Sequence, residues 1–122
     1  MSPRQDTDTH ATPVGLSKPV GSAAASAGTT ATVCVSGELD LDTAARIAPR
    51  LVRSLHDAGR VLALDLGGLR FCDSSGVNLF LRLDRLSRAE GKQLRLQHIP
   101  AQPARVLRLL GVHHRLACDF AA

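Results

Sequence analysis

Two adjacent serines, Ser74 and Ser75, stand where a chain can carry a phosphate group. They follow an apolar run, residues 61–66, that is typical of a buried strand, and they precede residues 78–89, whose apolar side chains recur at helical spacing. We therefore expect the serines at the N-terminus of a helix, where free backbone N–H groups and the positive end of the helix dipole can receive a phosphate. This placement favours a phosphorylation site over an active site.

The residues around these serines do not match the common catalytic or nucleotide-binding motifs. Taken alone, Asp73 and Gly76 complete an ordinary helix start with an Asp or Ser cap. A hydrolase nucleophile elbow requires G-x-S-x-G, and Cys72 stands two residues before Ser74, where that motif needs glycine. The chain contains neither the Gly-Lys-Ser/Thr of a phosphate loop nor G-x-G-x-x-G. An enzyme built on Ser74 is therefore the least favoured interpretation, and we expect no catalytic residue and no cofactor.

Other polar residues are candidates of lower weight. The tetrapeptide 37–40, Gly-Glu-Leu-Asp, is in isolation a solvated turn between a strand and a helix. Asp65 lies on an expected strand, where a hydrogen-bonded residue is more ordinary than a catalytic acid. His113 and His114 are adjacent, and we expect such a pair to point apart rather than to converge on a metal. No metal site is predicted.

The composition describes one globular domain. The chain has 122 residues, 44% of them apolar, and a net charge of +4, which allows an acidic partner. Because Trp and Tyr are absent and no run of Lys or Arg occurs, direct nucleic-acid binding is not expected. Three widely spaced cysteines without a C-x-x-C pair fit a reducing cytoplasm. The sequence shows neither a signal peptide nor a membrane span, so we expect a cytoplasmic protein that does not bind a membrane.

The order of patterns predicts an α/β fold. Residues 1–28 are rich in small and polar residues and predict a disordered tail, whereas residues 29–122 form the domain. Asp42 or Thr43 is expected to cap the first helix, which Pro49 should kink or delay. Strands that alternate with helices imply a parallel or mixed sheet with helices packed on it. The expected strands are residues 30–36, 60–66, 93–97 and 115–120, and the expected helices end near residues 57, 89 and 110.

Two motifs together carry a family resemblance. Gly37-Glu38-Leu39-Asp40 follows the first strand, and Asp73-Ser74-Ser75-Gly76 follows the second, with a helix between them. This arrangement over residues 29–120 resembles the STAS domain family, specifically the bacterial anti-sigma factor antagonists. The resemblance implies a mixed β-sheet with helices packed on it. The family usually carries a final helix after the last strand, and we expect that helix to be missing here because the sequence ends at Ala122.

The resemblance also implies a function. In the family, the first Ser after the Asp, which matches Ser74, is phosphorylated by an ATP-using kinase that is also an anti-sigma factor. The unphosphorylated antagonist binds this anti-sigma factor and so frees the sigma factor, and a serine phosphatase resets the switch. Asp40 matches an acid near the phosphorylation site, Asp73 shapes the helix start, and Gly76 is expected to let the backbone approach the partner. The implied partner-binding residues are Asp40, Asp73, Ser74, Ser75, Gly76 and Asn78. The alternative is a STAS module that serves as a scaffold or regulatory subunit of another signalling or transport complex.

Overall fold

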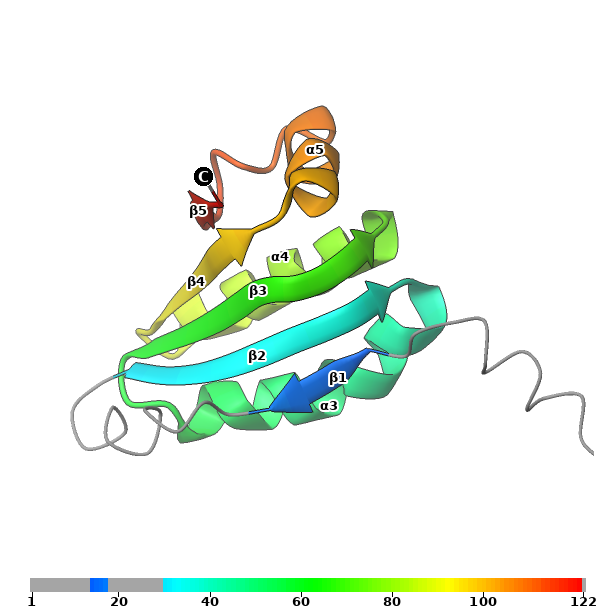
Figure 1. Cartoon of the computed structure of the whole chain (residues 1–122). Helices are drawn as coiled ribbons and strands as arrows, with labels where there is room; N and C mark the ends of the chain where they lie inside the picture. The colour runs from blue at the N-terminus through cyan, green and yellow to red at the C-terminus, as the bar shows by residue number, and fades with distance from the viewer. Residues whose placement is uncertain (1–13, 18–29, 122) are drawn as a thin grey trace, which may run out of the picture.

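The computed structural model describes residues 14–17 and 30–121 of the chain. Strands and helices alternate along these residues, as the sequence predicts (Figure 1). The elements are β1 (Gly15–Ser17), β2 (Thr30–Leu39), α3 (Leu41–Asp57), β3 (Val61–Cys72), α4 (Ser74–Ala89), β4 (Gln93–Ile99), α5 (Ala101–Leu109) and β5 (Ala117–Phe120). No helix among them is both long and apolar enough to span a membrane.

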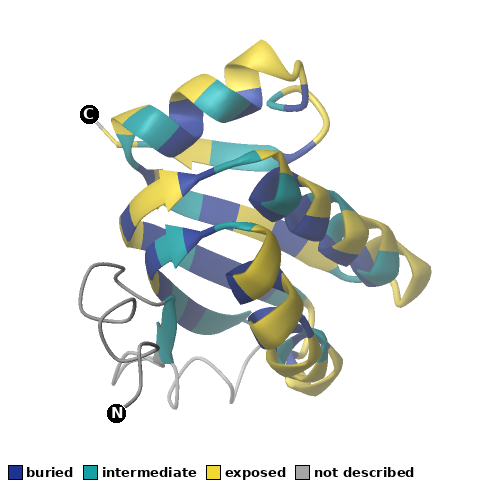
Figure 2. Cartoon of the chain, turned by 90° about the vertical axis from the view of Figure 1, so that its right-hand side faces the viewer, coloured by how far each residue is buried: buried dark blue, intermediate teal, exposed yellow. Residues whose placement is uncertain are grey.

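The strands form one mixed sheet in the order β1-β2-β3-β4-β5. β1 runs antiparallel to β2, and the other neighbours are parallel. Because parallel neighbours are joined by right-handed crossovers, α3 and α4 pack on the same face of the sheet (Figures 1 and 2). The carboxyl ends of β2 and β3 therefore lie side by side, and each is followed directly by a helix. The predicted α/β architecture is confirmed.

The core lies between the sheet and these two helices. Leu62, Leu64 and Leu66 alternate along β3 and are fully buried on the helix-covered face. Their partners on α4 include Phe80 and Leu83, which are also fully buried. Figure 2 shows the buried residues as stripes along the strands and along the inner sides of α3 and α4. This layer fixes the two helices, and so it fixes where their N-termini lie.

Two structural features correct the expected elements near the site. The first helix begins at Leu41 and is capped by Asp40, rather than by Asp42 or Thr43. Pro49 lies inside this helix and does not interrupt it. Pro49 and Ala45 are both exposed, so water can bond the Ala45 carbonyl that the missing proline N–H leaves free.

β2, β3 and β4 are also longer than the strands expected at residues 30–36, 60–66 and 93–97, whereas β5 is shorter than the strand expected at residues 115–120. β3 continues past Gly67 and Gly68 to Cys72. It stays paired with β2 over this length because the register shifts between Cys34 and Ser36 and again between Gly37 and Glu38. A Cβ atom on Gly68 would stand 3.0 Å from the Cβ of Ser36, so glycine allows the close approach there. At the N-terminal side, β1 lies within the segment 1–28 that was predicted to be a disordered tail, and it pairs through Leu16 with Val35. The rest of the predicted tail lies outside the described residues. At the other end of the chain, β5 is the last element among the described residues.

Candidate functional site

The two predicted motif loops meet at the carboxyl edge of the sheet. Leu39 and Cys72 are register partners at the ends of β2 and β3. The backbone N–H of Asp73 donates a hydrogen bond to the carbonyl of Leu39, at 3.2 Å. Asp40 and Asp73, the residues that directly follow these two strands, are the N-caps of α3 and α4. The structure therefore brings both motifs together, as the family resemblance implies.

Asp73 caps α4 with its own side chain. Its Oδ1 atom accepts hydrogen bonds from the backbone N–H groups of Ser75 at 2.9 Å and Gly76 at 3.4 Å. These are the donors that we expected to receive a phosphate, and the carboxylate already occupies them. A phosphate on the neighbouring serine would therefore project toward solvent beside a carboxylate instead of docking on the helix end.

Ser74 is the first residue of α4, and its side chain is exposed. Within the described part of the chain, its hydroxyl has no hydrogen-bond partner. No carboxylate or imidazole of those residues is hydrogen-bonded to it. The hydroxyl is therefore accessible from solvent at the first turn of α4.

Asp40 is held in a reciprocal capping box. Its Oδ1 accepts from the backbone N–H of Thr43 at 3.0 Å, and the Thr43 hydroxyl accepts from the backbone N–H of Asp40 at 2.8 Å. Thr43 also donates from Oγ1 to the carbonyl of Glu38 at 2.9 Å. The backbone hydrogen bond from Thr43, the largest cause, lowers the pKa of the Asp40 carboxyl. Asp40 is half-buried, so its first role in this structure is to begin α3.

Gly76 has a different role from the one predicted. It is buried, and a Cβ atom there would stand 2.7 Å from Cys72 Sγ and 2.8 Å from Leu39 Cδ2. Glycine thus lets the first turn of α4 press against the ends of β2 and β3, and it does not offer backbone to a partner at the surface. Burial, with a smaller contribution from the Asp73 charge, raises the pKa of the Cys72 thiol to about 12.

Gln102 on α5 is a supporting residue that the sequence did not reveal. Its side-chain oxygen accepts from the backbone N–H of Cys72 at 2.9 Å, and its nitrogen donates to the carbonyl of Cys72 at 3.1 Å. The amide thus satisfies both backbone groups at the end of β3, as another strand would. A glutamine on an expected surface helix carries no signal of this long-range contact.

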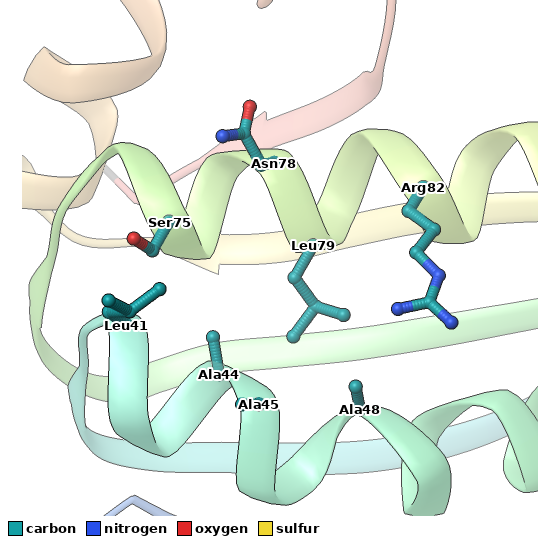
Figure 3. A pocket seen from close by; sticks show the side chains of 8 residues that line it. All are labelled: Leu41, Ala44, Ala45, Ala48, Ser75, Asn78, Leu79 and Arg82. Atoms are coloured by element: carbon teal, nitrogen blue, oxygen red, sulfur yellow. The ribbon is translucent and has the colours of Figure 1, made fainter.

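A groove runs between α3 and α4 beside Ser74. Its volume is about 250 Å³, and in Figure 3 the side chains of Ser75, Leu79 and Arg82 point toward α3, whereas Asn78 points away from it. Leu41, at the mouth of the groove, is 70% exposed although it is a large apolar residue. Sequence analysis identified Ser75 and Asn78 but missed Leu41 and Arg82. The groove is lined by Leu41, Ala44, Ala45, Ala48, Ser75, Asn78, Leu79 and Arg82.

The remaining candidates lie away from this edge loop or serve other contacts. Asp65 accepts a hydrogen bond from the backbone N–H of Gly67 at 2.9 Å and lies 3.2 Å from Nδ1 of His98, which confirms a hydrogen-bonded strand residue. The expectation that His113 and His114 point apart is wrong, because their ring centroids are 3.9 Å apart. Across residues 14–17 and 30–121, no group of three or more His, Cys, Asp or Glu side chains is arranged to hold a metal ion.

Comparison with known proteins agrees with this architecture. The family model described as "Mlab, STAS domain" matches residues 22–117. No curated protein matches the chain significantly.

Several solved structures share the fold. An anti-sigma factor antagonist from Mycobacterium paratuberculosis is 18% identical, with a TM-score of 0.72 over 87% of this chain and 85% of that chain. The anti-sigma factor antagonist SpoIIAA in its unphosphorylated form is 21% identical, with a TM-score of 0.67 over 89% of this chain and 88% of that chain. SpoIIAA of Bacillus in its phosphorylated form is 22% identical, with a TM-score of 0.58 over 89% and 91%. With a family model spanning most of its length, the chain belongs to the STAS domain family.

Proposed function

We propose that this protein is an anti-sigma factor antagonist that is switched by phosphorylation of Ser74. In its unphosphorylated form it binds an anti-sigma factor that is also a serine kinase, and this binding releases the sigma factor. Phosphorylation ends the binding, and a serine phosphatase restores it. The proposal rests on the Ser74 hydroxyl, which is exposed at the first position of α4 and makes no hydrogen bond within the described residues.

The physics of the site supports a switch in binding rather than in folding. A phosphate on Ser74 adds about −1.5 to −2 charges and three strong hydrogen-bond acceptors. Since the serine hydroxyl stabilises nothing in the described residues, its modification removes no contact from the fold. The charge would instead add to that of the neighbouring Asp73, and a partner packed on this edge would have to desolvate both.

The solved relatives favour this proposal over the alternative of a scaffold or transport subunit. One of the structures with this fold is named as an anti-sigma factor antagonist in its unphosphorylated form, and another as its phosphorylated form. Both names describe those proteins, and they support a phosphorylation switch here because Ser74 is available in the same fold.

The test begins with the intact mass of the protein purified from its native host, followed by fragmentation across residues 70–88. One phosphate located on Ser74 is the expected result. We then expect Ser74→Ala to bind a host anti-sigma factor kinase permanently and Ser74→Glu to bind it at least about 100-fold more weakly, because of the added charge at the interface. Equal binding by both variants, with no phosphate in any growth condition, would overturn the proposal in favour of a constitutive scaffold.

A further inference from the structure

We propose that the groove between α3 and α4 receives an acidic, amphipathic helix of the partner protein. The inference rests on the proposed function, because it identifies the chemistry of the surface that the antagonist recognises on its partner. It concerns residues that the family motifs do not include, chiefly Leu41, Ala45 and Arg82.

The floor of the groove fits apolar side chains. Ala44 and Ala48 on α3 and Leu79 on α4 are buried and face one another across it (Figure 3). The alanines leave the space that larger residues would fill, and Leu41 is 70% exposed at the mouth. An exposed leucine beside an apolar hollow is typical of a docking surface, because a side chain that stays in solvent contributes little to the stability of the fold.

The dimensions of the groove favour a helix as the occupant. The lining residues extend from position 41 to position 48 on α3 and from position 75 to position 82 on α4, or about 10 Å along each helix at 1.5 Å per residue. Two turns of a helix span this length and present apolar side chains at three- and four-residue spacing. The volume of about 250 Å³ accommodates one or two such side chains.

The charge of the groove lining selects an acidic helix. The side chain of Arg82 lies over the groove in Figure 3. Arg82 is the one charged side chain among the residues that line the groove. A carboxylate on the polar side of a docked helix would pair with Arg82, whereas a lysine would be repelled by it.

An acidic occupant also links the groove to the switch. Ser75 lines one end of the groove, and the phosphorylation candidate Ser74 is its immediate neighbour on α4. A dianionic phosphate there would stand at the mouth of a groove filled by a negatively charged helix. Repulsion between the two would release the partner without any change in the fold.

The inference is tested with the full chain labelled with ¹⁵N and with a peptide probe. The probe is a blocked 15-residue peptide with leucine at helical i, i+3, i+4 and i+7 spacing and glutamate elsewhere, and its matched control has lysine in place of glutamate. We expect saturable amide shifts at Ala44, Ala48, Leu79 and Arg82 with the acidic peptide only. The Kd should rise at least about tenfold in Arg82→Glu. Arg95→Glu makes the same charge change on the sheet face opposite the helices, and it should alter the Kd less than about twofold.

The outcomes separate this inference from the proposed function. Shifts confined to other surfaces, equal binding of both peptides, or an unchanged Kd in Arg82→Glu would overturn the groove assignment. None of these results depends on an anti-sigma factor, so they leave the switch at Ser74 to its own test. If a host anti-sigma factor kinase binds the wild type but not Ser74→Glu, and binds Arg82→Glu as tightly as the wild type, the switch stands and the groove assignment is wrong.

Discussion

The N-termini of α3 and α4 lie at the same edge of the sheet and are capped by the same residue type, but their first turns differ in where a hydroxyl stands. Asp40 and Asp73 are both extended N-caps that accept backbone N–H groups of the following turn. On α3 a hydroxyl stands at the third helical position, Thr43, where it bonds back to the cap. On α4 the hydroxyls precede that position, which is occupied by Gly76. The Thr43 hydroxyl thus stands two helical positions later than the Ser74 hydroxyl. This difference in position separates a hydroxyl that supports the helix cap from one that is free for modification.

The largest expected effect comes from adding a side chain at the third position of α4. Gly76→Val places methyl groups against Cys72 Sγ and Leu39 Cδ2, where a Cβ atom alone would be at 2.7 and 2.8 Å. Relief requires the helix to move away from the sheet, so we expect a loss of about 3 kcal/mol in the free energy of unfolding. Urea denaturation measures this loss.

The matched control for this change is a substitution at a surface position of the same turn. Ser74→Ala should change the free energy of unfolding by less than about 0.5 kcal/mol, because the exposed hydroxyl makes no contact within the described residues. A Gly76→Val protein as stable as Ser74→Ala would show that the close packing of α4 on Leu39 is not required.

A smaller loss is expected when the structural hydroxyl of α3 is removed. Thr43→Val keeps the shape of the buried side chain but leaves the Asp40 N–H and the Glu38 carbonyl without their hydroxyl partner. Two unsatisfied, partly buried backbone groups and a weakened cap should cost about 2 kcal/mol in unfolding free energy. If Thr43→Val and Ser74→Ala were equally stable by urea denaturation, the distinction between the two hydroxyls would fail.

Much of this site was accessible from the sequence because its signals are local. The helix start at Ser74 follows from the change of period between residues 61–66 and 78–89. The cap of α3 was misassigned because Asp40, Asp42 and Thr43 all suit an N-cap, and propensity alone does not choose among them. The Asp40–Thr43 spacing, a pair of side chains able to bond reciprocally, was the signal that would have decided it.

The parts that escaped prediction depend on contacts between distant segments. Gly76 is buried because Leu39 ends the neighbouring strand, and Gln102 matters because α5 brings it to Cys72. Neither relation leaves a local pattern. The groove likewise requires two helices whose packing is set by the sheet, so Leu41 and Arg82 became visible only in the folded chain.

The smallest expected effect is a pH dependence that belongs to the cap of α3. The folded state lowers the pKa of Asp40 below its ordinary value of 3.8, chiefly through the Thr43 backbone hydrogen bond. The unfolded chain therefore binds a proton at Asp40 more readily than the folded chain, and the stabilisation by this carboxylate is complete well above 3.8 and is lost as the pH falls through the lowered value. Asp40→Asn keeps a good N-cap without a titrating group.

The difference in unfolding free energy between wild type and Asp40→Asn should therefore shrink as the pH is lowered from 7 toward 3, while the acid-induced loss from all other groups is common to both proteins. Urea denaturation at a series of pH values measures the difference. Two curves that stay parallel over the whole range would mean that the Asp40 charge adds nothing to the capping box. The thermodynamic advantage of this helix start would then come from the Thr43 hydroxyl alone, and the contrast with α4 would rest on the position of a hydroxyl and not on the state of a carboxylate.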